Sequence, residues 1–406
     1  MRGRRGFVLV TMVVSAVAVL ACVGLAVDTG YLQLVKSRMQ TAADAAAMGG
    51  VQEIKQNGPS HAVEAAMADS ALNGFTNGVS SVSVTVNNPP ATGFYTSDPT
   101  AMEVIVSQNV GTLFMSVLGF TSVRVRARSV ARQGAGSSCL YTLDRNANNA
   151  FAASGGVNVV VNCGIVVNSD SDRALTASGG AHVTATSISV AGDYASSGGA
   201  VLSPAPVTGV EPENDPLAYL TPPPVGSWDH PSKTDISGGA VTTLHPGVYC
   251  KGIGISGGSR VTFEPGTYIL LGGGLNISGG SIVSGTGVTF YNTFASGKPY
   301  GAISISGGTT VTFSAPTTGS LAGILFYQDP AAGNGPPNTL SGGASSVFNG
   351  ALYFPTTELS YSGGSAGNYT IIVSKTISFS GGSTLNANYS SLPGGSPVKG
   401  SAALSE

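Results

Sequence analysis

The sequence predicts an N-terminal transmembrane helix with a small α+β unit, followed by an all-β right-handed parallel β-helix or β-solenoid. Three observations support this prediction. An uncharged apolar run of 21 residues lies near the N-terminus, three segments of alternating apolar and polar residues follow it, and a Ser-Gly-Gly motif then recurs. Only 9% of the 406 residues are charged and 58 are glycine, which favours glycine-punctuated β structure over charge-driven disorder. The net charge of −2 argues against a nucleic-acid-binding chain.

The first predicted element is a membrane span. Residues 1–27 form a basic flank with Arg2, Arg4 and Arg5, followed by the uncharged run 7–27. A helix of that length spans roughly 31 Å, close to the ~30 Å hydrocarbon core of a lipid bilayer. The arginines predict a cytoplasmic N-terminus. The sequence therefore indicates a single-pass inner (cytoplasmic) membrane protein, with the C-terminal bulk in the periplasm or outside the cell.

Three alternative fates of this leader stay open. A lipoprotein site at Cys22 is one, although the run continues apolar past it, which argues against cleavage there. A cleaved signal peptide normally has an apolar core of about 7–15 residues, shorter than this run. A prepilin leader would be cut between Gly6 and Phe7, but such leaders usually carry Glu at the fifth mature position, where this sequence has Thr11. The length of the run favours a retained anchor.

Residues 28–133 predict a helical stalk and a small α+β unit. Apolar residues at three- and four-residue spacing continue the helix beyond the span, Gly49-Gly50 weaken it, and residues 61–72 indicate a second helix. Residues 112–118 have the pattern of a further short helix. The alternation predicts strands at 81–86, 102–106 and 122–128.

The last of these strands places Arg124, Arg126 and Arg128 on one face. An anionic partner is one interpretation of this face. No aromatic residues lie between the arginines to stack bases, so we expect a solvated strand face and no nucleic-acid partner.

The N-terminal residues also carry a resemblance to a known family. Gly24-Leu-Ala-Val-Asp28-Thr-Gly and, further on, Gln40-Thr-Ala-Ala-Asp44-Ala-Ala-Ala follow the basic flank and the apolar run. This arrangement over residues 1–50 resembles the N-terminal module of TadG-like Flp (tight adherence) pilus-assembly proteins. The resemblance implies a pilin-like unit, membrane anchoring, and the pilus-assembly machinery or pilins as partners, with Asp28, Gln40 and Asp44 as motif residues.

Many longer members of that family carry a von Willebrand type A domain with an Asp-x-Ser-x-Ser metal site. This sequence contains no such motif. Metal-dependent adhesion is therefore not part of what the resemblance implies for this chain.

Residues 134–395 predict the solenoid. Most intervals between the repeats are near 20 residues, and apolar residues keep a fixed phase with each motif. A single unit of this kind cannot bury its apolar face, but stacked units can. We expect roughly eight to ten coils with Ile, Val and Phe inward and Gly-Gly at a corner that needs positive φ. The motif starts at Ser154, Ser178, Ser197, Ser237, Ser256, Ser278, Ser306, Ser341, Ser362 and Ser380.

Two segments depart from the repeat. Residues 203–236 are rich in proline and fall within a single long interval that resembles one skipped turn. They predict a surface excursion from the solenoid. Residues 396–406 predict a flexible tail.

The cysteines predict one disulfide. Cys139 and Cys163 bracket the first Ser-Gly-Gly motif and lie about one coil apart in sequence. Residues one coil apart in a solenoid are about one strand spacing (~4.8 Å) apart, within disulfide reach. We expect a Cys139–Cys163 bridge that staples the terminal coil, while Cys250 stays an unpaired buried thiol.

The sequence predicts no catalytic, cofactor or metal site. Matches to G-x-S-x-G and G-x-G-x-x-G at 252–258 arise from the repeat, because no His follows Ser256 and no helix begins there. The segment 168–172 offers oxygen ligands but lacks a complete calcium loop. Acidic residues after residue 236 are few and do not recur at coil spacing, so a polysaccharide-active enzyme is the least favoured function.

We therefore predict a non-enzymatic pilus-assembly or minor-pilin-like protein that displays its solenoid for surface assembly or adherence. The alternative is an adhesin that binds surface glycans. Outward rows of Ser, Thr and Asn permit that alternative, as do four tyrosines of the repeat, Tyr249, Tyr268, Tyr291 and Tyr327.

Overall fold

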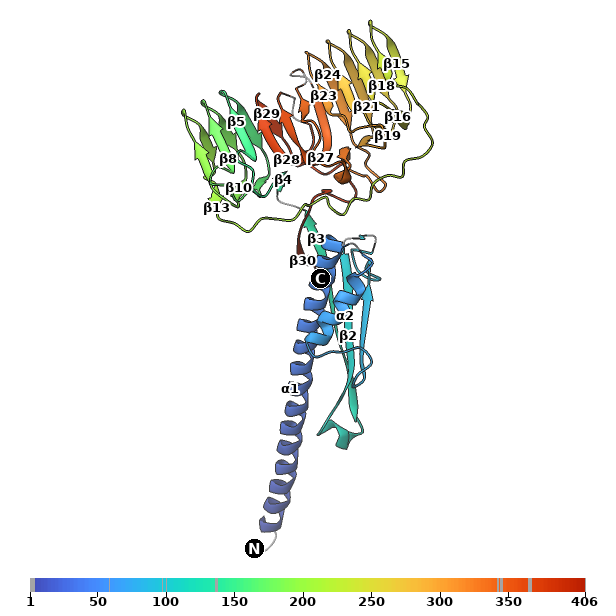
Figure 1. The fold of residues 1–406 in the computed structure, drawn as a ribbon. Coiled ribbons are helices and arrows are strands. Elements are labelled where there is room, and N and C mark those ends of the chain that lie inside the picture. Colours follow the sequence, from blue (N-terminus) through green and yellow to red (C-terminus); the bar gives the residue numbers. More distant parts are fainter. Residues whose placement is uncertain are drawn as a thin grey trace. The chain divides into compact units, whose positions relative to one another are not determined.

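The computed structural model describes residues 4–57, 59–96, 98–99, 101–135, 138–341, 343, 346–363 and 367–405. The first part of the predicted basic flank, with Arg2, lies outside the described residues. Contacts divide the chain into two compact units, Met1–Gly134 with Gly400–Glu406, and Ala135–Lys399. Figure 1 shows the elements of both units.

The first unit combines two helices with an antiparallel sheet. Its strand order is β1-β2-β3-β30, with β1 and β3 each antiparallel to β2. The 3₁₀ helix η1 lies in the turn between β2 and β3 (Figure 1). The helices and strands occur in the predicted order. The bounds are α1 Arg4–Asn57, α2 Ala62–Leu72, β1 Val82–Asn87, β2 Ala101–Gly111, η1 Met115–Leu118, β3 Ser122–Ala135 and β30 Lys399–Leu404.

Helix α1 continues through Gly49-Gly50, where the sequence predicted a weakened helix. A Cβ on Gly49 would overlap the carboxylate of Asp69 in α2, and a Cβ on Gly50 would overlap the sulfur of Met102 in β2. The two glycines therefore let α2 and β2 approach the helix backbone. This packing offsets the roughly 1 kcal/mol that glycine costs in a helix interior.

The prediction of a flexible tail at 396–406 is wrong for most of that segment. Residues Lys399–Leu404 form β30, which lies beside β3 in the sheet of the first unit, and the Ser405 N–H donates to the Val130 carbonyl at 2.8 Å. The sequence carries no local signal for this strand, because Lys-Gly-Ser-Ala-Ala-Leu contains no β-branched or aromatic residue and does not alternate between apolar and polar positions.

The core of the first unit lies between α1 and the sheet. Small α1 residues are completely buried there, and valines of β1 and β2 pack against the same cluster. Alanines allow helix and sheet to approach closely, so the apolar periodicity after Asp28 marks the buried face of α1. The fully buried α1 residues are Met39, Ala42, Ala43, Ala46, Ala47 and Val51.

The second unit is a parallel β-solenoid, as the repeat predicted. Three columns of strands run along it, and the strands within each column pair in parallel. The first column contains β16 (Gly247–Cys250), β19 (Gly266–Leu271), β22 (Val288–Thr293), β25 (Ile324–Gln328), β27 (Val347–Tyr361), β28 (Thr370–Phe379), β4 (Ser138–Thr142), β7 (Gly164–Val167), β10 (Ser187–Val190) and β13 (Val207–Thr208).

The other two columns share β27 and, in part, β28 with the first, because these strands are long. The second contains β14 (Thr234–Ile236), β17 (Ile253–Ile255), β20 (Leu275–Ile277), β23 (Ile303–Ile305), β26 (Asn338–Leu340), β27, β28, β5 (Phe151–Ser154), β8 (Leu175–Ser178) and β11 (Tyr194–Ser196). The third contains β15 (Val241–Leu244), β18 (Arg260–Phe263), β21 (Ile282–Thr286), β24 (Thr310–Ser314) and β27, and separately β29 (Ser383–Leu385), β6 (Asn158–Val161), β9 (His182–Thr184) and β12 (Val201–Ser203).

The order of coils in the stack differs from their order in the chain. Strand β28, near the C-terminal end of the repeat, pairs in parallel with β4 and β5, which begin it. The first coil therefore lies in the middle of the stack. The outermost coils are formed by β10–β13 at one end and by β14 and β15 at the other (Figure 1).

The proline-rich segment is the connection that this order requires. It leaves β13 at one end of the stack and reaches β14 at the other, so it is a crossover and does not replace one skipped turn. Nine strand spacings between these ends amount to about 43 Å. The residues between β13 and His230 can extend to roughly 70 Å, so the segment is long enough to span the stack.

The Ser-Gly-Gly corners stack on one another through backbone hydrogen bonds. The Gly258 N–H donates to the Gly279 carbonyl at 2.9 Å, and the same bond recurs from Gly239 to Gly257 and from Gly280 to Gly307. Both glycines of the corner at 257–258 have positive φ, +63° and +72°. Pairs of glycines with positive φ recur at the other corners from 155–156 to 307–308, although not at 381–382, and this conformation explains why glycine occupies those corners.

Candidate functional site

The motif residue Asp28 holds the turn between β2 and β3 against α1. Its side chain is buried, and its carboxylate accepts hydrogen bonds from the backbone N–H groups of Leu113 (3.0 Å) and Met115 (2.6 Å). One turn earlier in α1, the ring of Phe114 lies against Gly24, where a Cβ would come within 2.7 Å of the ring. The glycine and the aspartate of the motif thus form one docking site for this turn.

The second half of the motif attaches β3 to α1. The Gln40 side-chain amide donates to the backbone carbonyl of Arg128 at 3.0 Å and to the Asp44 carboxylate at 2.8 Å. The structure therefore brings Asp28 and Gln40 to opposite parts of the same β2–β3 hairpin. Their roles are positional, because both bind backbone groups of the chain itself.

The sequence predicted a solvated arginine face on β3, and for Arg128 this prediction is wrong. Its guanidinium contacts the fully buried carboxylate of Glu103 at 2.6 Å. Burial raises the pKa of Glu103, but hydrogen bonds from Thr92, Arg128 and Asn87 outweigh it and lower the pKa to about 2. This buried network joins the loop before β2 to the sheet.

The structure joins Cys139 and Cys163 by a disulfide, with Cα atoms 5.8 Å apart. Because β28 stacks on β4, this bridge staples two coils inside the stack and not a terminal coil. Cys250 is a buried free thiol in β16, and Cys22 is an exposed free thiol in α1.

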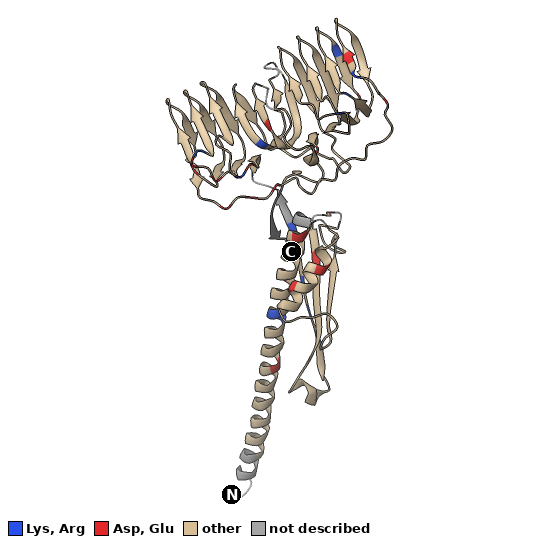
Figure 2. Ribbon diagram, in the orientation of Figure 1, with Lys and Arg blue, Asp and Glu red and all other residues tan. Residues whose placement is uncertain are grey.

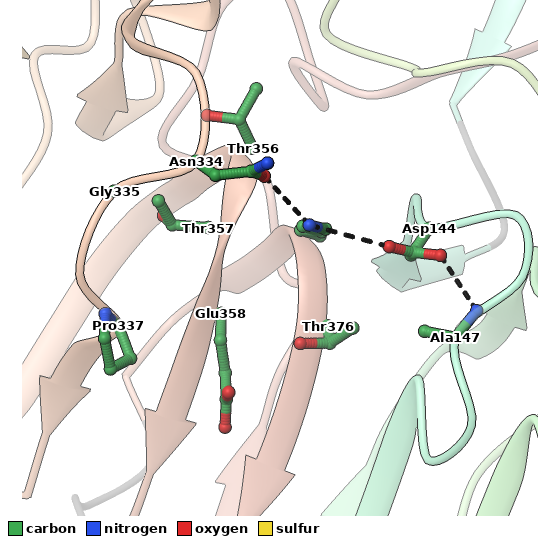
Figure 3. Close-up of a pocket in the computed structure, with 10 residues that line it drawn as sticks. Asp144, Ala147, Asn334, Gly335, Pro337, Thr356, Thr357, Glu358 and Thr376 are labelled. Atoms are coloured by element: carbon green, nitrogen blue, oxygen red, sulfur yellow. Dashed lines mark hydrogen bonds and ion pairs between the residues drawn. The ribbon is translucent and has the colours of Figure 1, made fainter.

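A polar groove of about 310 Å³ lies on the second unit where the C-terminal and N-terminal ends of the repeat meet (Figure 3). The turn after β4, the loop after the 3₁₀ helix η2 (Pro330–Ala332), and the middle parts of β27 and β28 line it. The Lys375 ammonium donates to the Asn334 side chain at 2.9 Å and lies 3.8 Å from the Asp144 carboxylate. Glu358 and Thr376 line the same groove.

The walls of this groove are fixed by further hydrogen bonds. Asp144 also accepts the N–H groups of Asn146 and Ala147, at 3.0 and 2.8 Å. Behind the opposite wall, Gln328 bonds the hydroxyls of Thr356 and Thr357 at 2.7 and 2.9 Å. The groove thus presents a cation, two carboxylates and an amide on a rigid frame, a combination that suits a hydroxyl-rich ligand.

Sequence reasoning missed this groove. Asp144 and Glu358 lie 214 positions apart in the chain, as the residue numbers show, and they meet because β28 neighbours β4 and β5. The segment 328–337 after Tyr327 lacks the repeat pattern and has the composition of a loop, but nothing local indicates which coil lies next to it.

The four tyrosines offered for glycan binding are buried. Tyr249, Tyr268, Tyr291 and Tyr327 are each at most 2% exposed. The Tyr327 hydroxyl donates to the Leu220 carbonyl in the crossover at 2.9 Å. These residues therefore stabilise the solenoid and cannot contact a glycan at its surface.

The polar segment 168–172 also has a structural partner. Asn168 is buried and exchanges two hydrogen bonds with the backbone of Glu213 in the crossover, at 2.8 and 2.9 Å. Over the described part of the chain, no group of three or more His, Cys, Asp or Glu side chains is arranged to hold a metal ion.

These features define a class of protein: an anchor helix that carries a docked hairpin and a separate β-solenoid. Within α1, the stretch Val10–Ile54 is long and apolar enough to cross a membrane by length and composition, and its most apolar window is almost entirely exposed. Residues 6–53 match the family model described as putative Flp pilus-assembly TadE/G-like. This match confirms the resemblance and fits a pilus-associated membrane protein. No curated protein and no solved structure matches the chain.

Proposed function

We propose that this protein is a membrane-anchored component of an Flp-type pilus system that displays a non-catalytic β-solenoid outside the cytoplasm. The observation that carries the proposal is the correspondence between motif and structure. The segment similar to the pilus-assembly family is the segment in which Gly24, Asp28 and Gln40 dock a hairpin onto an apolar helix.

The orientation of the anchor follows from the charges around the apolar run. Arg2, Arg4 and Arg5 precede the run and Asp28 is the first charged residue after it. Positive residues are retained on the cytoplasmic side. The solenoid then lies beyond the membrane, where the Cys139–Cys163 disulfide is stable to the redox environment.

Mass spectrometry of the N-terminal peptide tests this function. Sheared surface filaments and washed membranes would be compared. Peptides in filaments that start at Phe7 would indicate a processed pilus subunit, whereas an intact leader found only in membranes would indicate an anchored assembly or surface protein. Absence from both fractions would refute the proposal.

Glycan binding at the polar groove is the second candidate function. The groove supports it because Lys375, Asp144 and Glu358 offer both donors and acceptors to hydroxyl groups. A glycan array probed with the full chain and with Lys375→Ala tests it. Lys233→Ala is the matched control, because Lys233 forms an exposed ion pair with Asp235 outside the groove. Binding that both variants retain would exclude the groove.

A further inference from the structure

The turn between β2 and β3 keeps an apolar surface exposed beyond what its docking against α1 covers. The side chains are between 49% and 85% exposed, and residues 104–123 contain no charged residue and no histidine. Figure 2 shows this end of the hairpin without charged residues. We call these residues the hairpin tip: Leu113, Phe114, Val117, Leu118 and Phe120.

The hairpin tip is held at one level of α1. The Asp28 carboxylate binds the N–H groups of Leu113 and Met115, and Phe114 lies against Gly24. Gly24 belongs to the last turn of the uncharged run 7–27. The tip therefore lies beside the point where the anchor helix would leave the hydrocarbon.

The apolar surface of the tip continues that of α1. Large apolar side chains of α1 from Val10 to Val27 are exposed in the same unit, up to the turn that contacts Phe114, with only Thr11 and Ser15 polar among the residues of this stretch. Exposed apolar patches of this kind mark contact surfaces for proteins or membranes. Continuity with a surface that itself requires lipid favours the membrane as the occupant.

Several backbone N–H groups of the tip already have hydrogen-bond partners within the protein. Besides the two N–H groups bound by Asp28, the N–H groups of Val117, Gly119 and Phe120 donate to carbonyls within the turn at 3.0–3.2 Å. Backbone groups that meet lipid need internal partners, since the hydrocarbon offers none.

We infer that the hairpin tip inserts into the lipid interface beside α1 and forms a second membrane contact of this chain. The inference rests on the proposed anchoring by α1. A single helix can rotate about its axis and tilt in the bilayer. A tip that is docked at Gly24 and Asp28 and inserted at the interface would fix the rotation and tilt of α1 relative to the membrane. Interfacial apolar residues of this type reach about 5–10 Å into the headgroup and acyl boundary.

Depth-dependent fluorescence quenching tests this inference on the full chain in phosphatidylcholine–phosphatidylglycerol vesicles. An environment-sensitive dye would be attached at Val117→Cys, Phe94→Cys or Val17→Cys, one at a time, after Cys22→Ser and Cys250→Ala remove the free thiols. Val117 is 85% exposed, so its substitution leaves the fold intact. Phe94, 88% exposed near the opposite end of the hairpin, is the matched apolar control. Spin labels near the headgroup or near the bilayer centre would serve as quenchers.

We expect quenching at position 117 mainly by the shallow spin label, quenching at position 17 mainly by the deep one, and none at position 94. A dye at 17 that is quenched while the dye at 117 behaves like the one at 94 would overturn the inference and leave the anchor intact. A dye at 17 that escapes both quenchers would refute the membrane anchor, and the inference would fall with it.

Discussion

Removal of the Asp28 carboxylate should release the hairpin tip from α1. Asp28→Ala deletes two hydrogen bonds from backbone N–H groups, those of Leu113 at 3.0 Å and Met115 at 2.6 Å. Hydrogen bonds to charged groups contribute about 1.5–3 kcal/mol each. Together the two bonds would contribute about 3–6 kcal/mol, but the freed N–H groups lie in an exposed turn and regain water or headgroup partners. We therefore expect a net loss below that range, about 2–3 kcal/mol.

Amide hydrogen exchange of the full chain in detergent measures this loss directly. Because about 1.4 kcal/mol corresponds to a tenfold change, the amides of residues 113 and 115 should exchange about 30- to 150-fold faster in Asp28→Ala. Asp28→Asn keeps one acceptor oxygen and should give a smaller increase. The control is Thr29→Ala, because the neighbouring Thr29 hydroxyl donates to the helix carbonyl of Leu25 at 2.7 Å and so bonds α1 itself.

The reasoning would be refuted by an Asp28→Ala variant whose amides at 113 and 115 exchange within about threefold of the parent, that is, within about 0.7 kcal/mol. The docking of the turn would then depend on the packing of Phe114 against Gly24 and not on the carboxylate. Equal acceleration in Thr29→Ala would also contradict it, because the effect would then be a general weakening of α1.

Three further predictions concern buried groups. The pKa of Glu103, lowered to about 2 from an ordinary 4.5, predicts stability of the first unit that is fully present above about pH 4.5 and lost as the pH falls towards 2. The loss by pH 2 is about 3 kcal/mol, and acid titration of denaturant midpoints should show it in the parent and not in Glu103→Gln. Replacing Cys139 and Cys163 by serine opens a loop of 24 residues and should lower solenoid stability by about 3.4 kcal/mol, measured by denaturant unfolding; an unchanged midpoint would contradict this. Tyr353→Phe removes the 2.7 Å hydrogen bond to the partly buried Asp215 carboxylate and should accelerate amide exchange in the crossover by about 10- to 150-fold, whereas unaltered exchange would show that other contacts hold the segment.

The sequence by itself determined the local elements and their type. The uncharged run fixed α1 as a candidate span, alternation fixed β1 to β3, and the phase of apolar residues with each Ser-Gly-Gly fixed a parallel solenoid. These signals are periodic, and periodicity depends on neighbours a few positions apart. The spacing of Cys139 and Cys163 was informative for the same reason, since the two successive coils that contain β4 and β7 are neighbours in the stack.

The sequence did not determine which coil follows which in the stack. Every coil presents nearly the same strand edges. The edge of the first coil can therefore pair with a coil from any other part of the chain. The tertiary structure decided that β28 precedes β4, that the proline-rich segment crosses the stack, and that β30 joins the first unit. The groove around Lys375 is a product of that decision, and so is the burial of Tyr327 beneath the crossover. When many strand edges are nearly identical, the pairing that forms is the one with the lowest total packing energy of the whole stack. No local pattern in the sequence shows which pairing that is.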